Sequence, residues 1–513
     1  MCADLGRESG RRPLMVVSNR EPYLHRRRLD GSIAAVPTTG GVAVALCALM
    51  RDRGGTWIAH GAGDADRDVV DANDRIQVPP DSPAYTLRRI WLTPEEEQRY
   101  YNGFANEGLW PLCHIAHVRP VFRSEDWEEY RRINGRFAEA IVQELGDPGT
   151  PIFIQDYHLA LTAALLRERN PLVRTALFWH IPWPHPDRLR MCPWRQEIMR
   201  GLLANDLLAF QLERDRRNFL LGVRDELVAR VDRDVVRMDG RATRVAAQPI
   251  GVDFDRIQKV AADESQMQET ERLRRELRLD DPEITTIGVG VDRLDYTKGI
   301  PERLEAIDRL LTTRSDLRGH LVFVQVGVPS RSKIESYAAI EKQIDEQVAA
   351  INSKHGNGPA DGPIRYRKSA LKIRKLVALY RLADFCVVSS LHDGMNLVAK
   401  EFVAARDDRD GVLVLSEMTG AAQELTDALI INPYHIDGFA AAIERAIAMP
   451  ADERAARMRS LRRAVAGHDV FLWASDILER LDHAAPKDPF DDGSAGSVGA
   501  GAGKPFRRTD GPR

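Results

Sequence analysis

Two stretches of the sequence carry residue types suited to binding phosphate. In GVGVDRLDYTKG (288–299), Arg293 and Lys298 follow a strand-like run. Cations at the carboxyl end of a strand suit a diphosphate, because arginine chelates its oxygens and lysine acts as a point charge. The alternative is that Arg293 only pairs with Asp292 or Asp295, and the residues themselves leave both interpretations open.

The second stretch, SSLHDGMNLVAKEF (389–402), has the pattern of a strand-to-helix corner. Amides from Gly394 to Leu397 at a helix start favour a phosphate group. Asp393 could accept hydrogen bonds from sugar hydroxyls, and Glu401 could chelate a vicinal diol such as a ribose. The competing interpretation is a simple helix cap, with Asp393 as the N-cap and Glu401 in solvent.

Further candidates occur in the N-terminal half. Arg20 ends a strand-like run, and Gly40 and Gly41 precede an apolar helix, where glycine lets the backbone approach a ligand closely. A tight turn and a surface arginine explain these residues equally well. Asp156 and His180 also end strand-like runs and could orient sugar hydroxyls, although an isolated histidine is more often part of the core.

Two other motifs are set aside. CHIAH (113–117) has no completing ligand pair at a spacing typical of metal sites. GAGAGK (499–504) is followed by Pro505 in place of Ser or Thr and has no flanking strand or helix, so it is not a phosphate loop. The sequence therefore predicts neither a metal site nor a cofactor.

The elements that must position these residues follow a repeating pattern. Short apolar, β-branched runs alternate with longer amphipathic segments, as in buried parallel strands joined by crossover helices. The runs are 14–19, 151–158, 175–183 and 205–211, then 284–293, 320–328, 384–390, 411–417 and 428–434. Two successive blocks predict an α/β fold with two doubly wound domains, and ligands in such sheets bind at the carboxyl ends of the strands.

Domain boundaries follow from breaks in the pattern. Pro249 and Gly251 interrupt it, which divides residues 1–250 from 251–467. We expect residues 468–483 to form a final amphipathic helix that packs back on the N-terminal domain. The remaining segment, 484–513, is rich in Gly, Pro, Ser and Ala and is predicted to be disordered.

Composition excludes several functional classes. The 513 residues carry a formal net charge of −3, and 43% are hydrophobic. Near-neutral charge gives no support for a nucleic-acid or membrane-surface partner. No apolar run approaches the roughly 20 residues needed to span a bilayer. Five scattered cysteines without a CxxC pair indicate reduced thiols, so we predict a cytoplasmic protein, and a homo-oligomer is compatible with the sequence.

Taken together, these stretches resemble the retaining glycosyltransferases of the trehalose-6-phosphate synthase family from about residue 14 to 482. The resemblance rests on SNR (18–20), TGGVAVAL (39–46), YYNGFANEGLWPLCH (100–114), DYHLAL (156–161), WHIPWP (179–184), RQEIMRGLLANDLLAFQ (195–211), PIGVD (249–253), GVDRLDYTKG (290–299), VPSR (328–331), DGMNLVAKE (393–401) and VLSEMTGAAQEL (414–425). It implies a GT-B fold, in which two facing Rossmann-like domains enclose an interdomain active-site cleft. It also implies transfer of glucose from a nucleotide-glucose, usually UDP-glucose, to glucose 6-phosphate.

The resemblance assigns roles position by position, with the acceptor site in the N-terminal domain and the donor site mainly in the C-terminal one. The implied catalytic residues are Arg293, Lys298, Asp393 and His180; the donor-binding residues are Gly40, Gly41, Met395, Asn396, Leu397 and Glu401; and the acceptor-binding residues are Arg20, Tyr101, Trp110, Asp156 and Arg331. The implied mechanism is metal-independent and front-face, with the cations stabilising the leaving diphosphate.

Some motifs point to alternatives. SNREPY (18–23) and NLVAKE (396–401) also resemble the glucosylglycerol-phosphate synthases, which use glycerol 3-phosphate as the acceptor. KSALKIRKL (368–376) departs from the pattern expected near the nucleotide base, so UDP, GDP and ADP donors all stay open. A catalytically inactive sugar-phosphate sensor is the alternative from a different functional class.

Overall fold

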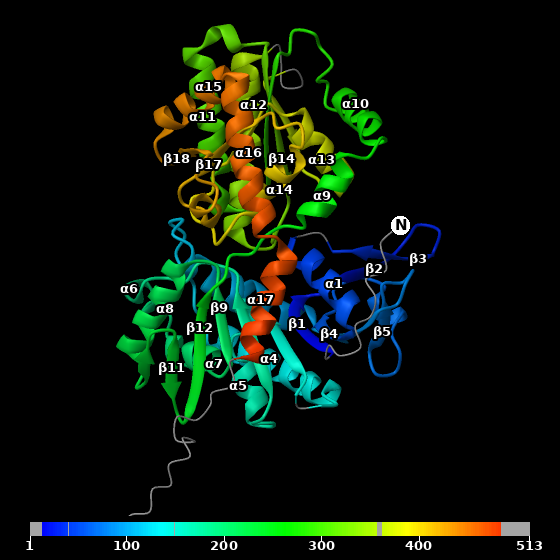
Figure 1. The fold of residues 1–513 in the computed structure, drawn as a ribbon, viewed down its shortest axis with the longest axis vertical. Helices are drawn as coiled ribbons and strands as arrows, with labels where there is room; N and C mark the ends of the chain where they lie inside the picture. Colours follow the sequence, from blue (N-terminus) through cyan, green and yellow to red (C-terminus); the bar gives the residue numbers. More distant parts are fainter. Residues whose placement is uncertain (1–12, 39–40, 148, 357–361, 484–513) are drawn as a thin grey trace, which may run out of the picture.

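The computed structural model describes residues 13–38, 41–147, 149–356 and 362–483, which form two α/β units built on separate sheets (Figure 1). The N-terminal unit contains a ten-stranded sheet of order β10-β11-β12-β9-β8-β7-β1-β4-β6-β5 and a separate hairpin, β2-β3. The C-terminal unit contains a six-stranded parallel sheet of order β15-β14-β13-β16-β17-β18. Both orders contain crossovers, as the predicted doubly wound α/β fold requires.

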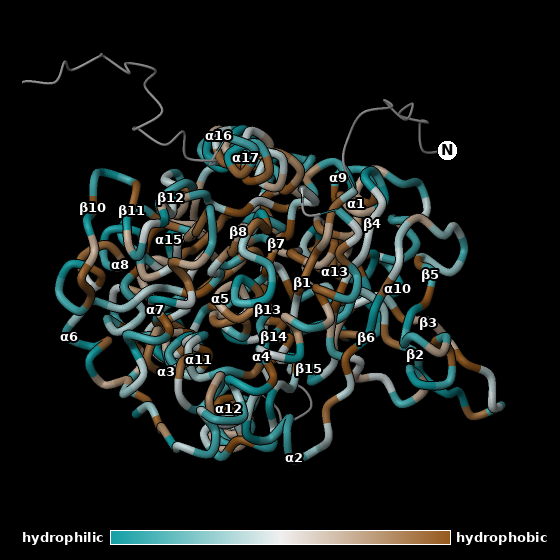
Figure 2. Tube along the Cα trace, turned by 90° about the horizontal axis from the view of Figure 1, so that it is seen from below, coloured by the Kyte–Doolittle hydropathy of each residue, from teal (hydrophilic) through white to brown (hydrophobic). Residues whose placement is uncertain are grey.

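The nine apolar runs all form strands. The strands of the N-terminal unit are β1 (Leu14–Arg20), β2 (Tyr23–Arg27), β3 (Ile33–Pro37), β4 (Gly55–His60), β5 (Arg75–Val78), β6 (Tyr85–Ile90), β7 (Pro151–Gln155), β8 (Arg174–Trp179), β9 (Leu207–Phe210), β10 (Arg230–Asp232), β11 (Val235–Met238) and β12 (Arg241–Ala247). Those of the C-terminal unit are β13 (Thr286–Arg293), β14 (Leu321–Val328), β15 (Ile364–Arg367), β16 (Phe385–Val388), β17 (Val412–Ser416) and β18 (Leu429–Ile431). The central ones are buried on both faces, and Figure 2 shows apolar residues concentrated along them.

Helices cover both faces of the sheets. They are α1 (Gly41–Arg53), α2 (Pro94–Glu97), α3 (Trp110–Cys113), α4 (Ser124–Glu144), α5 (Thr162–Arg167), α6 (Pro186–Leu189), α7 (Arg195–Leu202), α8 (Glu213–Glu226), α9 (Phe254–Ala261), α10 (Gln266–Glu276), α11 (Ile300–Thr313), α12 (Glu335–His355), α13 (Ile373–Leu382), α14 (Leu397–Ala405), α15 (Ile436–Ala448), α16 (Ala451–Gly467) and α17 (Val470–Asp482). A π-helical segment, η2 (Gln98–Leu109), joins α2 to α3. No helix among the described residues is long and apolar enough to cross a membrane.

The chain passes between the two units twice. The first crossing follows β12, and the second lies between α16 on the C-terminal unit and α17 on the N-terminal unit (Figure 1). The two connecting segments are in contact with each other. A Cβ on Gly251 would overlap the carbonyl oxygen of His468, and the Val470 amide donates to the Val252 carbonyl at 3.3 Å. Only a glycine at position 251 permits this approach.

Helix α17 packs against α1, β8 and β9, and its Trp473 ring lies 5.0 Å from the ring of Phe178. We propose that the two units are the predicted domains, 1–250 and 251–467, with 468–483 as the returning helix. Residues 484–513, including GAGAGK, lie outside the described residues.

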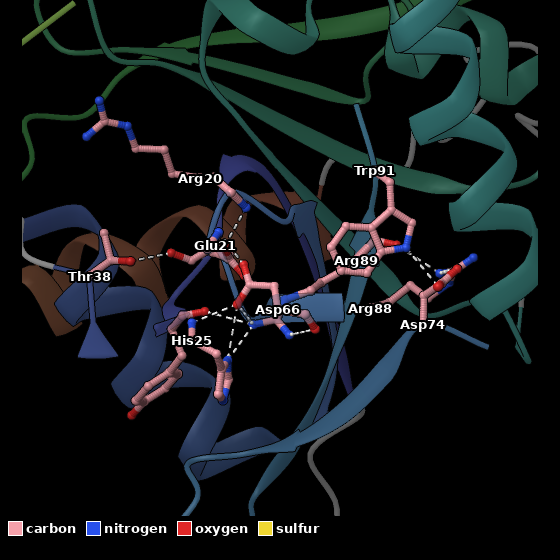
Figure 3. A network of polar contacts seen from close by, with 12 residues as sticks. Arg20, Glu21, His25, Thr38, Asp66, Asp74, Arg88, Arg89 and Trp91 are labelled. Atoms are coloured by element: carbon pink, nitrogen blue, oxygen red, sulfur yellow. Dashed lines mark hydrogen bonds and ion pairs between the residues drawn. The ribbon is translucent and has the colours of Figure 1, made fainter. Parts of the chain in front are cut away.

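A buried polar cluster fixes the end of β1 beneath the hairpin (Figure 3). The Arg89 side chain, which is fully buried, donates to Glu21 Oε2 at 2.7 Å and lies 2.9 Å from Asp66 Oδ1. His25 Nδ1 lies 3.2 Å from the same Asp66 oxygen. Burial, together with a hydrogen bond to Asp66, raises the pKa of Glu21 to about 8, whereas the pKa of Asp66 is held well below its usual range. At neutral pH the two carboxyl groups therefore share one proton beside Arg89.

We expect Glu21→Gln to reduce the pH dependence of stability. Protonated Glu21 contributes stability that is fully present below its ordinary pKa of 4.5 and is lost as the pH rises through about 8. Glutamine does not titrate, so the fall in unfolding free energy between about pH 5 and pH 9 should shrink by roughly 4 kcal/mol. Any constant change in stability that the amide introduces does not affect this difference. Thermal unfolding of both chains across this range measures the slope. Equal slopes for wild type and variant would contradict the assignment.

Candidate active site

The sequence-predicted residues gather where the carboxyl ends of the parallel strands of the two sheets face each other. Arg20 ends β1 and Arg293 ends β13, while Asp156 and His180 directly follow β7 and β8. Carboxyl ends of parallel strands share one edge of a sheet, which explains why residues distant in sequence meet there. The two edges are in contact, since Arg331 of the C-terminal unit donates to the Tyr157 hydroxyl of the N-terminal unit at 3.2 Å.

Lys298 and Asp393 form the closest ion pair of the site. Lys298 Nζ lies 2.5 Å from Asp393 Oδ2, and the same oxygen accepts hydrogen bonds from Ser390 and Asn396, each at 3.2 Å. Burial disfavours the charged form of Asp393, but the Lys298 ammonium outweighs it and lowers the pKa of Asp393 to about 2. The carboxylate is therefore an oriented acceptor that stays ionised at neutral pH.

Two arginines of the C-terminal unit share a carboxylate. Asp295 Oδ2, which is fully buried, lies 3.6 Å from Arg293 and 3.7 Å from Arg331. The Trp110 ring of the N-terminal unit lies against both guanidinium groups, 4.2 Å from that of Arg331 and 5.5 Å from that of Arg293. Of the two carboxylates that the sequence offered to Arg293, Asp295 therefore forms a long ion pair with it. Asp292 instead pairs with Arg303 at 2.7 Å.

Arg20 and Arg331 enclose the Tyr101 hydroxyl. Arg20 donates to Tyr101 Oη at 3.3 Å, and the Tyr101 ring stacks on His158. Burial raises the pKa of this phenol, but the positive charges of Arg331 and Arg20 prevail and lower it to about 7. The same charges favour any other anion at this position.

His180 and Asp156 are held together at adjacent strand ends. The His180 amide donates to Asp156 Oδ1 at 3.0 Å, and its Nε2 lies 3.0 Å from Gln155 Oε1. Asp156 has a positive φ of 74°, which turns its carboxylate back toward the sheet edge. Burial lowers the pKa of His180 to about 3 and raises that of Asp156 to about 6, so His180 is a neutral hydrogen-bonding group.

The corner after β16 differs in one respect from the sequence interpretations. Helix α14 begins at Leu397, and its N-cap is Asn396, whose side chain accepts from the Ala399 amide at 3.4 Å. The interpretation of Asp393 as the N-cap is therefore wrong, because Asp393 lies three residues further out and pairs with Lys298. Within the described part of the chain, the amides of Met395, Asn396 and Leu397 donate no hydrogen bond, which leaves three donors for an anion or sugar.

Of the remaining candidate residues, Glu401 and Gly41 belong to described helices, and Gly40 does not belong to the described residues. Glu401 on α14 accepts a hydrogen bond from Tyr380 at 3.3 Å, and burial raises its pKa to about 7. Gly41 is the first residue of α1, whereas Gly40 lies outside the described residues. No group of three or more His, Cys, Asp and Glu side chains suited to a metal occurs in the described ranges, and the metal-free site stays a prediction.

Sequence reasoning missed several residues that shape the site. Tyr157 and Tyr337 both hydrogen-bond to Arg331, at 3.2 and 2.5 Å, and fix its guanidinium. His392 accepts a hydrogen bond from the Ile115 amide of the other unit at 3.1 Å. In the sequence, both tyrosines have the surroundings of ordinary core residues. No neighbouring motif therefore indicated that they bind Arg331.

The charges define what the site can bind. Arg20, Arg293, Lys298 and Arg331 supply four cations, whereas the carboxylates paired directly with them are Asp295 and Asp393. The net positive charge suits two separate phosphorylated groups, one near Arg20 and one near Lys298. Neutral His180, Asp156 and the free amides can orient hydroxyls between them.

Known proteins resemble this chain over most of its length. The model of glycosyltransferase family 20 matches residues 12–483. A trehalose-6-phosphate synthase of Mycolicibacterium paratuberculosis is 38% identical over 488 residues, which are 93% of this chain and 97% of that protein.

Two solved structures resemble both units. An α,α-trehalose-phosphate synthase (UDP-forming) of Burkholderia xenovorans in complex with glucose-6-phosphate superposes with a TM-score of 0.80 at 33% identity, covering 92% of this chain and 100% of that one. An E. coli structure bound with UDP-2-fluoro glucose gives 0.80 at 32% identity, with 91% and 98% coverage. The match to these relatives confirms the predicted GT-B fold class.

Proposed function

Because the chain belongs to glycosyltransferase family 20, we propose that it transfers glucose from a nucleotide-glucose, with UDP-glucose as the first candidate, to glucose 6-phosphate. The product is trehalose 6-phosphate, formed with retention of configuration. The observation that carries the proposal is the group of four cations at the facing sheet edges: Arg20 and Arg331 around the Tyr101 hydroxyl, Arg293 beside Asp295, and Lys298 paired with Asp393. We assign Arg20 and Arg331 to the acceptor phosphate, and Arg293 and Lys298 to the donor diphosphate. The relatives bound with glucose-6-phosphate and with UDP-2-fluoro glucose support the same pair of ligands.

The proposed chemistry is a front-face displacement. The 1-hydroxyl of glucose 6-phosphate attacks the anomeric carbon, the bond to the diphosphate oxygen breaks, and the leaving diphosphate takes the hydroxyl proton. Arg293 and Lys298 stabilise the charge that develops on the diphosphate, the kind of preorganised electrostatic effect that dominates many catalysed reactions. Asp393 and His180 orient the transferred glucose, and the amides of residues 395–397 bind phosphate and sugar. Glu401 binds the ribose diol.

A panel of substrates tests the proposal. UDP-, GDP- and ADP-glucose are each incubated with glucose 6-phosphate or with glycerol 3-phosphate, and products are identified by mass spectrometry and NMR. We expect trehalose 6-phosphate, with an α,α linkage, and fastest turnover with UDP-glucose. Exclusive reaction with glycerol 3-phosphate would instead make the chain a glucosylglycerol-phosphate synthase. Binding of both ligands without turnover would make it a sugar-phosphate sensor.

Tyr101 should make acceptor binding depend on pH. Below about pH 7 Tyr101 is neutral and leaves Arg20 and Arg331 free for the phosphate; above it, the phenolate neutralises part of their charge and repels the acceptor. We expect the KM for glucose 6-phosphate to rise roughly 10-fold by about pH 9, which corresponds to about 1.4 kcal/mol. Steady-state kinetics of wild type and Tyr101→Phe measure the effect. A phenylalanine variant with the same rise would contradict it.

A further inference from the structure

The CHIAH segment, which carries no metal-site spacing, makes a polar contact between the two units. The Ile115 amide of the N-terminal unit donates to His392 Nδ1 of the C-terminal unit at 3.1 Å. Beside it, the rings of His114 and His392 lie 6.0 Å apart in a T-shaped arrangement, and those of His117 and Tyr434 lie 6.2 Å apart. We call these five residues the interdomain clasp.

Each side of the clasp is continuous with one side of the candidate active site. His392 directly precedes Asp393, the partner of Lys298. On the other side, the His114 ring stacks on Trp110 with centroids 4.1 Å apart, and Trp110 lies under the Arg331 guanidinium. The contact between Ile115 and His392 therefore joins the segment that carries Trp110 to the segment that carries Asp393.

The N-terminal side of the clasp is held rigidly. Arg188 of α6 donates to three carbonyl groups at the end of α3: those of Pro111 and Leu112 at 2.6 Å each and that of His114 at 2.9 Å. These charge-assisted bonds fix the backbone from which the Ile115 amide projects. The position of that N–H is thus set by the N-terminal unit and not by the contact itself.

His392 is also restricted to one protonation state. To accept from Ile115, Nδ1 must carry no proton, so the neutral ring bears its proton on Nε2. The groups facing His392 are His114, Arg188 and Arg214, with Arg214 Nη2 3.4 Å from Nε2, and Asp393. Burial, assisted by the positive charge of Arg214, lowers the pKa of His392 to about 3, so the acceptor persists across the physiological range.

We propose that His392 is a positioning residue, which through its hydrogen bond with the Ile115 amide holds Asp393 and the donor site in register with the Trp110 segment of the acceptor site. The inference rests on the proposed function and adds a role for a residue outside the catalytic set. Without the clasp, each unit still binds its own ligand, but the acceptor hydroxyl is poorly aligned with the anomeric carbon of the donor. Water then reacts with the donor in place of the acceptor, and hydrolysis competes with glucosyl transfer.

Two single variants remove the two ends of the hydrogen bond. His392→Leu removes the acceptor, and Ile115→Pro removes the donor; the extended backbone of His114 (φ −102°, ψ 130°) is compatible with a following proline. His392→Asn is the matched control, because its amide oxygen can accept the same bond. The readout is the ratio of glucosyl transfer to hydrolysis of UDP-glucose, measured as nucleotide release with and without glucose 6-phosphate.

We expect His392→Leu and Ile115→Pro each to lower this ratio about 10-fold, the double variant to lower it no further, and His392→Asn to keep at least half of it. Such non-additivity identifies one shared interaction. A wild-type ratio in both single variants, or effects that multiply in the double variant, would overturn the proposal.

A second measurement separates this inference from the proposed function. Amide hydrogen exchange at Ile115 is protected in the wild-type chain and in His392→Asn, and we expect exchange at least 10-fold faster in His392→Leu. Equal protection in the leucine variant would overturn the clasp. A wild-type chain that forms no glucosylated product with any donor would overturn the proposed function while the exchange result still decides the clasp.

Discussion

Replacing Lys298 with alanine should lower kcat about 100- to 1,000-fold, the loss typical of removing one preorganised donor to a developing oxyanion. Lys298 is nearly buried, 9% exposed, and its ammonium lies 2.5 Å from Asp393. In the proposed mechanism the variant loses the charge that stabilises the leaving diphosphate, and it also leaves Asp393 without its cation, so the pKa of that carboxyl rises. Arg293→Ala should produce a loss of the same order, because the proposed mechanism gives Arg293, at the end of β13, the same role toward the diphosphate.

Pre-steady-state turnover of UDP-glucose with saturating glucose 6-phosphate measures the chemical step. Lys342→Ala is a suitable control, since Lys342 is a surface residue whose side chain is 78% exposed in a pair with Glu346. Near-normal turnover in both Lys298→Ala and Arg293→Ala would contradict the proposed role of these two residues in binding the donor diphosphate.

Gly394→Ala should lower kcat/KM by about 100-fold, because a displacement near 1 Å at a reacting centre has an effect of this size. A Cβ at position 394 would overlap the carbonyl oxygen of His180 in the other unit. The distance between the two atoms would be well below 3.0 Å, which is shorter than the contacts that Cβ atoms make in proteins. The obstacle is backbone at the end of a buried strand, which cannot rotate away. The two sheet edges must separate, and Asp393 then moves away from His180.

Gly135→Ala is the matched control for this substitution. Gly135 lies within helix α4, and a Cβ there meets no atom within 4 Å. Alanine at an open helical position stabilises by roughly 0.5–1 kcal/mol, so activity should be unchanged and the melting temperature slightly higher. An active Gly394→Ala enzyme would show that the two edges need not approach so closely during turnover.

Much of the fold could be predicted because the decisive strands are buried on both faces. In runs such as LMVVSN (14–19) and HLVFVQVGV (320–328), apolar residues do not alternate with polar ones. This pattern is typical of central strands that are buried on both faces. The strands that were not predicted are shorter or partly exposed. β15 (Ile364–Arg367) carries two arginines in four residues, and β10 to β12 form an antiparallel edge with a polar face, so their composition resembles that of loops.

The site could be predicted as a set of residues but not as a set of contacts. The cations at the ends of strands were readable from the sequence, since position and charge together indicated an anion. That Lys298 pairs with Asp393, 95 residues away, depends on the neighbouring positions of β13 and β16 in the sheet. The N-cap of α14 was assigned to Asp393 in one interpretation because both Asp393 and Asn396 are good caps, and only the tertiary ion pair distinguishes them.

The return of α17 to the N-terminal unit has a consequence for how the protein matures on the ribosome. In chain order, the C-terminal unit is an insertion between β12 and the helix that completes the core behind β7 and β8, where Trp473 contacts Phe153, Phe178 and His180. The N-terminal unit, although synthesised first, therefore keeps an uncovered apolar face until about residue 482 has emerged. The His180 side of the candidate active site is thus completed last, and a chain that lacks α17 lacks the packing behind His180.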